Sequence, residues 1–188
     1  MGNNPDLIEG LLREDAYPHP VKSLKLIETH ISWIILTGIY AYKIKKKVDF
    51  GYINYLKLSD RIYFCREELR INRELSKNLY LDICWITSQE DKPYITYQDK
   101  LDEKYNIIEV AVRMNEFKQN ELLSCKLQEK SVSKDSIRKL TIEIANFHLN
   151  RPKKLDNMFT DYNQTIEPVF SNINILKRIL VNDKQSLI

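Results

Sequence analysis

Three short apolar runs separated by turn residues predict a β-meander near the start of the chain. The runs are Leu24–Glu28, Ser32–Thr37 and Tyr40–Lys45, and Gly38 marks the second turn. Runs of this length that are rich in β-branched and aromatic side chains are typical of strands. Because the connections are short, we expect each strand to pair antiparallel with its neighbour. A short helix, Leu7–Leu12, precedes them.

Helical spacing replaces strand spacing after the meander. A spacing of three or four positions connects Ile62, Cys65, Leu69 and the pair Ile71–Asn72. This spacing places them on one face of an amphipathic helix. Ser59 and Asp60 are candidate N-cap residues, because their side-chain oxygens accept hydrogen bonds from the first free amides of a helix. We expect the helix to continue to about Leu75.

Two further strands and then helices follow. Leu79–Thr87 and Ile107–Met114 are apolar runs of strand length, and the polar segment Gln89–Tyr105 between them predicts a hairpin excursion. Beyond them we expect helices at Asn120–Glu129, after Ser133, and at Thr165–Leu180. The helix after Ser133 has an apolar stripe made by Ile137, Leu140, Ile144 and Phe147.

The order of these elements predicts an α+β fold in three parts. An N-terminal helix and linker occupy residues 1–20, and an antiparallel sheet with one helix occupies residues 21–118. The remainder, residues 119–188, is helical. The 188-residue chain is 43% apolar and 29% charged with a formal net charge of +3, values typical of a globular protein.

Several classes of site and partner are excluded by the distribution of residues. The basic clusters Lys45–Lys47 and Arg151–Lys154 are too short to predict a nucleic-acid surface. No apolar run reaches the roughly 18 residues that a membrane span needs, and we expect a cytoplasmic protein. The four glycines are too widely spaced for a P-loop or a Rossmann turn, in which backbone amides approach phosphate. The three cysteines are widely spaced, as expected for reduced thiols. The spacing of the cysteines and histidines does not match a metal-binding pattern.

The third strand has a pattern that binds nucleotide phosphates in kinases. Alternation along the strand places Ala41, Lys43 and Lys45 on one face. In kinases, a small residue leaves room for adenine, and a lysine two positions later contacts the α- and β-phosphates. By itself, such an A-x-K pattern is common in proteins of other classes.

A glutamate on the following helix normally positions this lysine. Glu67 and Glu68 are the candidates in this sequence. We favour Glu68, because it lies two helical turns before the apolar Leu75 and is therefore expected to face inward. Glu67 is the second choice.

Several segments, in this order along the chain, resemble a bacterial family. They are Glu28–Trp33, Tyr42–Lys46, Val48–Gly51, Glu67–Arg70, Asn72–Leu75, Leu79–Asp82 and Ala111–Met114. The chain resembles the two-part proteins in which an aminoglycoside-phosphotransferase-like domain precedes a P-loop ATP-binding domain. The resemblance extends from about Leu7 to His148. It implies the N-lobe of a protein-kinase-like fold at 21–118, followed by the first helices of a helical C-lobe at 119–188.

The resemblance also implies roles for individual residues. Lys43 would contact the nucleotide phosphates and Glu68 would pair with it. The segment Arg113–Phe117 would be the hinge whose backbone reads the adenine edge. His30 and Ser32 would lie in the turn that covers the phosphates, although a structural role for His30 is equally expected. The implied nucleotide-binding residues are Ala41, Lys43, Glu68, Arg113, Met114 and Asn115.

The catalytic residues of the family have no counterpart in this sequence. Phosphoryl transfer needs a carboxylate that orients the attacking hydroxyl, and Asn and Asp ligands for magnesium. The resemblance places them on a His-Gly-Asp loop after His148, where the chain has no further histidine or glycine. We expect His148 to be a packing or capping residue. We also expect no catalytic or metal-binding residues, weak or absent ATP binding, and magnesium binding only when a missing C-lobe is supplied.

Two interpretations of function remain open at this point. The first is the ATP-binding lobe of a small-molecule phosphotransferase, either a truncated gene product or half of a split enzyme. Its partner would be a downstream-encoded C-lobe or P-loop ATPase domain. The second is a non-catalytic interaction module, because an N-lobe without its C-lobe exposes apolar surface. Neither interpretation indicates a substrate.

Overall fold

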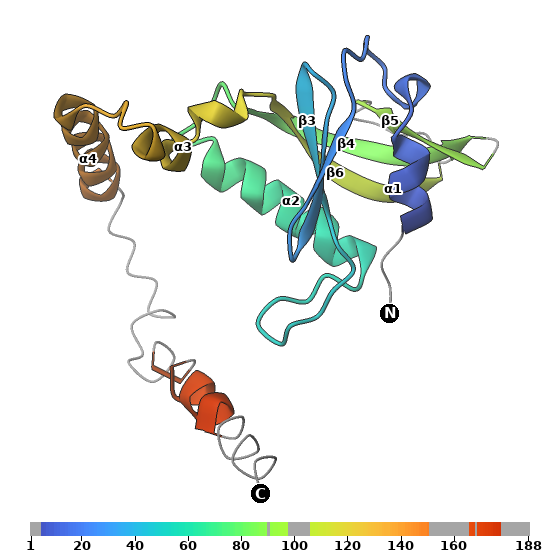
Figure 1. Cartoon of the computed structure of the whole chain (residues 1–188). Helices are drawn as coiled ribbons and strands as arrows, with labels where there is room; N and C mark the ends of the chain where they lie inside the picture. The colour runs from blue at the N-terminus through green and yellow to red at the C-terminus, as the bar shows by residue number, and fades with distance from the viewer. Residues whose placement is uncertain (1–4, 90, 98–105, 151–165, 168, 178–188) are drawn as a thin grey trace, which may run out of the picture. The chain divides into compact units, whose positions relative to one another are not determined.

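The computed structural model describes residues 5–89, 91–97, 106–150, 166–167 and 169–177 (Figure 1). Its elements are, in order, α1 (Pro5–Leu11), η1 (Glu14–Ala16), β1 (Lys25–Glu28), β2 (Ser32–Leu36), β3 (Tyr40–Lys45), α2 (Leu58–Asn72), β4 (Tyr80–Gln89), β5 (Lys92–Thr96), β6 (Ile107–Asn115), η2 (Gln119–Glu121), α3 (Leu123–Gln128) and α4 (Lys134–Leu149). The chain forms two compact units, Met1–Ser133 and Lys134–Ile188. The division therefore lies later than the predicted boundary at residue 118.

The first unit is built on a six-stranded antiparallel sheet with the order β1-β2-β3-β6-β4-β5. The predicted meander is confirmed, because β1 pairs with β2 and β2 pairs with β3. β6 lies between β3 and β4, although α2, β4 and β5 separate it from β3 in the sequence. The predicted hairpin excursion contains β5, which pairs with β4; its residues 98–105 lie outside the described part of the chain. The α+β class is thus confirmed.

Each face of the sheet has its own apolar cluster and its own helix. Buried residues of α1 (Leu7, Ile8 and Leu11) pack with Tyr42 and Ile44 of β3. On the opposite face, Cys65 of α2 shares a cluster with Ala41, the neighbouring strand position, and α2 lies against β6 and β4. The predicted alternation along β3 therefore decides which helix each side chain meets. Because α1 contributes to a cluster of the sheet, it belongs to the core of the first unit.

Helix α2 begins two or three residues earlier than expected, and its start is held by a buried ion pair. Its N-cap is Lys57, so Ser59 and Asp60 lie within the first turn and do not cap it. In this turn, Arg61 bonds Glu109 of β6 through Nε at 2.8 Å, and both side chains are 2% exposed. Arg61 also donates to the carbonyl of Tyr55 at 2.7 Å. The ion pair therefore ties the β3–α2 connection and the helix start to the centre of the sheet.

The far end of α2 corrects two expectations. Ile62, Cys65 and Leu69 pack on the sheet as their spacing predicts. Ile71, however, is 46% exposed, and Leu75 is 59% exposed and lies beyond the last helical residue. Ile71 is exposed because it lies two positions after Leu69 and therefore on another face of the helix. Leu75 is exposed because the helix ends at Asn72, where the chain turns away toward β4.

None of the described residues in the helices that follow β6 is buried. The single helix expected at Asn120–Glu129 is divided into η2 and α3, because Leu122 has an extended conformation. In the second unit, α4 has no buried residue, and the ring of His148 lies 5.5 Å from that of Phe147. Residues 166–167 and 169–177 are helical, within the last predicted helix. Nowhere in the described ranges is a helix both long and apolar enough to cross a membrane.

Candidate functional site

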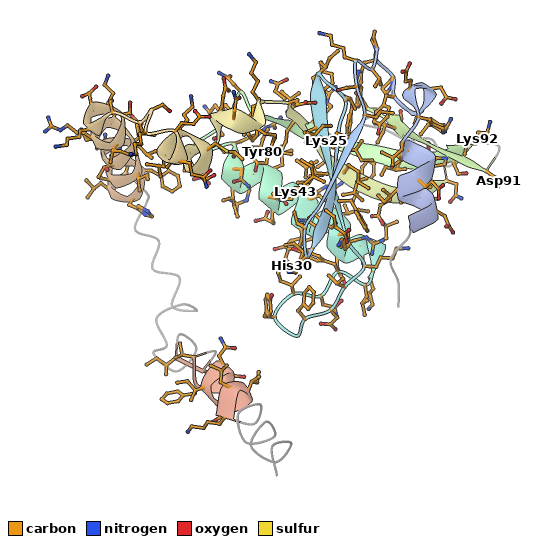
Figure 2. The ribbon with its side chains drawn as sticks, in the orientation of Figure 1. Lys25, His30, Lys43, Tyr80, Asp91 and Lys92 are labelled. Atoms are coloured by element: carbon orange, nitrogen blue, oxygen red, sulfur yellow. The ribbon has the colours of Figure 1, made fainter. Side chains whose placement is uncertain are left out.

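The lysine and glutamate expected to face one another are in contact. Lys43 Nζ of β3 lies 2.6 Å from Glu68 Oε1 of α2, and Lys43 projects beside the helix (Figure 2). A second lysine of the same strand face, Lys45, lies with Nζ 2.7 Å from Glu68 Oε2. Glu67 bonds Arg70 on the exposed side of the helix instead. The structure therefore selects Glu68 over Glu67 and places two ammonium groups on one carboxylate.

Burial and charge act in opposite directions on this group of three side chains. Burial raises the pKa of Glu68, but the lowering of this pKa by Lys45 and Lys43 is larger than the effect of burial. The pKa of Glu68 therefore lies below its usual range. Burial lowers the pKa of Lys45, but Glu68 more than offsets this effect and raises it. Glu68 and Lys45 are therefore charged near neutral pH, since opposite charges at this distance favour the ionised forms. The group as a whole has an excess of positive charge.

Neutral groups surround the two lysines and the glutamate. Burial raises the pKa of the Cys65 thiol to about 12, so this thiol stays protonated beneath them. Lys45 Nζ lies 5.0 Å from the centre of the Tyr55 ring. Burial also raises the pKa of Tyr80, with a further contribution from Glu68. A further carboxylate near Cys65, that of Glu109, is paired with Arg61.

Ala41 and Met114 adjoin this group on the same face of the sheet. They are register partners between β3 and β6, and they pack in one cluster with Leu36. Ala41 is 5% exposed and Met114 is 9% exposed. The structure thus brings together four of the six predicted nucleotide-binding residues: Ala41, Lys43, Glu68 and Met114.

The side chains of Arg113 and Asn115 lie on the opposite face. Arg113 bonds Asp82 at 2.6 Å, and its guanidinium lies 3.9 Å from the centre of the Tyr97 ring. Arg113 is the register partner of Tyr42, whose side chain is on the α1 side of the sheet. Asn115 donates to the carbonyl of Asn78. Sequence reasoning did not separate these two residues from Met114, although strand alternation predicts the separation.

The backbone of residues 113–115, the first part of the predicted hinge, is paired within the sheet. These residues belong to β6, and Arg113 and Met114 pair with strands on both sides. The Asn115 amide donates to Leu79 and the Glu116 amide to Ile39, each at 2.9 Å. Their amides are therefore occupied by sheet hydrogen bonds. Of the predicted hinge segment, Phe117 is the residue that lies clear of both β6 and these bonds.

The turn between β1 and β2 is tied by a threonine and lacks glycine. The Ser32 amide donates to Thr29 Oγ1 at 2.9 Å, and Thr29 Oγ1 donates to the Ser32 carbonyl at 3.0 Å. His30 is exposed at the tip of the turn (Figure 2). The Ser32 hydroxyl is buried and has no hydrogen-bond partner among the described residues. The turn places Ser32, not His30, on the strand face that carries Lys45.

A cavity of about 460 Å³ lies elsewhere, between η1, the segment that follows it, and β5. It is lined by polar residues that include Arg13, Asp15, Lys92 and Thr96. The guanidinium of Arg13 is already bonded to Asp15 and to the carbonyls of Gly10 and Pro93. Neither Lys43 nor Glu68 lines this cavity, so it is separate from the candidate site.

Sequence reasoning missed the two contacts that fix the geometry of the site. It placed Lys45 on the correct face but did not connect it with Glu68; two lysines at alternate positions opposite one inward glutamate were the available signal. It gave no role to Arg61 and Glu109. An acidic residue inside the apolar run Ile107–Met114 was the signal there, because such a residue needs a buried cationic partner.

The chain was compared with protein-family models, curated proteins and solved structures. No protein-family model, no curated protein and no solved structure matches the chain.

Proposed function

We propose that the first unit is the nucleotide-binding lobe of an aminoglycoside-phosphotransferase-like, protein-kinase-like protein, and that it binds ATP. The observation that carries the proposal is the 2.6 Å ion pair between Lys43 on β3 and Glu68 on α2. In kinases, a strand lysine paired with a glutamate of the next helix holds the α- and β-phosphates. Together with the motif resemblance, this pair supports a phosphate-binding role for Lys43.

The arrangement of the sheet supports the same proposal. A three-stranded meander is followed by one helix and then by the strands β4 to β6, and β6 lies beside β3. This topology places Ala41 and Met114 next to Lys43 on one face. An adenine site adjoining the phosphate-binding lysine requires this neighbourhood. Phe117, which follows β6, is the position from which the backbone reads the adenine edge.

ATP binding tests the proposal directly. Calorimetric titration of the purified protein with ATP gives saturable binding, and Lys43→Met weakens it at least about tenfold, because a charge-assisted contact to phosphate is lost. Lys46→Met is the control: Lys46 directly follows β3 but bonds Glu28 and lies over the Trp33 ring, away from Glu68. Absence of ATP binding, or equal affinity in Lys43→Met, contradicts the proposal.

We further propose that residues 1–188 by themselves transfer no phosphoryl group. The sequence lacks the His-Gly-Asp loop with its orienting carboxylate and the magnesium ligands, on which transfer depends. A helical lobe or a P-loop domain is the proposed partner. Incubation with radiolabelled ATP and magnesium gives no Lys43-dependent release of phosphate, and such release contradicts this part of the proposal.

A non-catalytic interaction module is the second candidate function. It is favoured by the apolar side chains of α4, since Ile137, Leu140 and Ile144 are each at least 40% exposed. Apolar residues that share one helix face normally pack against a partner. Light scattering after gel filtration tests this candidate. A monomer at all concentrations, with no binding to either proposed partner domain, counts against it.

A further inference from the structure

Two lysines share one carboxylate at the candidate site, but they differ in accessibility. The Lys43 side chain is 26% exposed, whereas that of Lys45 is 5% exposed. Both ammonium groups lie within 2.7 Å of Glu68. A ligand that arrives from solvent therefore meets Lys43 first, while Lys45 remains beneath the surface.

Movement of Lys43 toward a ligand changes the charge balance of Glu68. The Glu68 side chain is 13% exposed, and a poorly solvated carboxylate without a cation is strongly disfavoured. If Lys43 were the sole partner, its transfer to a phosphate would leave Glu68 in that state. Lys45 remains bonded to the other carboxylate oxygen, Oε2, and so keeps Glu68 compensated.

The surroundings of Lys45 suit a fixed group rather than a ligand-binding one. Its ammonium lies near the Tyr55 ring and bonds Glu68. The neighbouring Cys65 thiol is protonated, because burial raises its pKa to about 12, and therefore does not compete for the lysine. Ser32, the register partner of Lys45, is fully buried and closes the strand face on that side.

We propose that Lys45 is a positioning residue, which holds Glu68 and the adjoining turn of α2 while Lys43 exchanges between Glu68 and a phosphate oxygen of the nucleotide. The inference rests on the proposed function, since it assigns Lys43 to phosphate. It assigns Lys45 no contact with the ligand. The effect of Lys45 on binding therefore passes entirely through Glu68.

A double-mutant cycle separates this role from direct contact. ATP affinity is measured by calorimetry for the wild type, Lys45→Met, Glu68→Gln and the double variant. We expect Lys45→Met to weaken binding about tenfold in the wild type, because Glu68 loses its remaining cation. In the Glu68→Gln background we expect less than about a twofold change, since a neutral amide needs no cation. Equal weakening in both backgrounds overturns the proposal, as does no weakening in either.

Two control variants separate the effect of the lost Lys45 charge on ATP affinity from an effect of misfolding. Lys45→Arg retains the charge, so its ATP affinity stays within about threefold of wild type. Lys46→Met removes an equally buried lysine on the other side of the strand and leaves the affinity unchanged. Circular dichroism verifies that each variant is folded. If Lys45→Arg binds as weakly as Lys45→Met, charge compensation is not the cause and the proposal fails.

A readout without ATP distinguishes failure of this inference from failure of the proposed function. The carboxyl carbon of Glu68 is titrated by NMR in glutamate-labelled protein and assigned with Glu68→Gln. In Lys45→Met the pKa of Glu68 rises toward its usual range, and in Lys46→Met it does not change. If the wild type binds no ATP, the proposed function fails, and the titration alone decides the Lys45 assignment. An unchanged Glu68 titration in Lys45→Met overturns it.

Discussion

The buried ion pair between Arg61 and Glu109 is the most sensitive point of the first unit. Arg61→Met removes a guanidinium that bonds both carboxylate oxygens of Glu109 and the carbonyls of Tyr55 and Leu56. Glu109 is then left 2% exposed, and its remaining hydrogen bond comes from the Val110 amide. Breaking one partner of such a pair costs about 3–5 kcal/mol. Since domains are stable by roughly 5–15 kcal/mol, this is a large fraction of the total.

Urea denaturation followed by circular dichroism measures the loss. Arg61→Met lowers the free energy of unfolding by about 3–5 kcal/mol. The double variant Arg61→Met/Glu109→Met recovers most of this loss, because apolar side chains of similar volume replace the pair and leave no buried charge. Arg70→Met is the control, since Arg70 pairs with Glu67 on the helix surface with 61% of its side chain exposed; no measurable change is expected there.

The two variants together decide whether the reasoning holds. If Arg61→Met lowers the free energy of unfolding by less than about 1 kcal/mol, the ion pair contributes no more than a solvent-screened surface pair does. A double variant as unstable as the single one would show that the hydrogen bonds to Tyr55 and Leu56, rather than the uncompensated Glu109 charge, dominate the effect. Either result refutes the assignment of the penalty to the carboxylate.

Two further predictions concern pH and backbone conformation. Burial raises the pKa of Glu68, but Lys45 and Lys43 depress it below the usual 4.5, so the ionised Glu68 stabilises the fold above that pH and this stabilisation is lost as pH falls through the pKa of the folded state. The urea midpoint of the wild type is therefore expected to fall more steeply than that of Glu68→Gln between about pH 5 and pH 2. Parallel curves for the two proteins contradict this prediction. Gly38 and Gly51 both have positive φ, but a Cβ at Gly38 lies 2.7 Å from Lys22 Cβ whereas Gly51 has open space. Calorimetry is expected to show a loss of about 1 kcal/mol for Gly51→Ala and roughly 2–3 kcal/mol for Gly38→Ala; equal losses contradict the steric argument.

Local pattern was sufficient to predict most of the sheet. Strand alternation placed Ala41, Lys43 and Lys45 on one face, and the structure confirms this because the opposite positions pack against α1. The same rule, applied to β6, predicts that Arg113 and Met114 face opposite sides. It was not applied there, since the hinge assignment considered the backbone alone.

Long-range contacts were harder to predict, because one residue of each pair has no local signal. Arg61 has the same sequence context as a surface arginine near a helix start, and its burial depends on Glu109, which is 48 positions away. The inward direction of Glu68 was predicted correctly but for a wrong reason. Leu75, its supposed apolar anchor, is exposed, and the direction of Glu68 is fixed instead by Lys43 and Lys45.

In addition to the packing of Ile62, Cys65 and Leu69, two groups of charged side chains that differ in burial hold helix α2 on the sheet. Arg61 fixes its first turn through a pair that solvent does not reach, and Glu68 lies seven residues further, roughly 10 Å along the axis. If the contacts of Glu68 with Lys43 and Lys45 were broken while the Arg61 pair was kept, the C-terminal end of the helix would be the end that is free to move. Conformational regulation of this lobe would use such a movement of the C-terminal end of α2. A covalent cross-link between this end of the helix and β3 would prevent the movement and leave the Arg61–Glu109 pair unchanged.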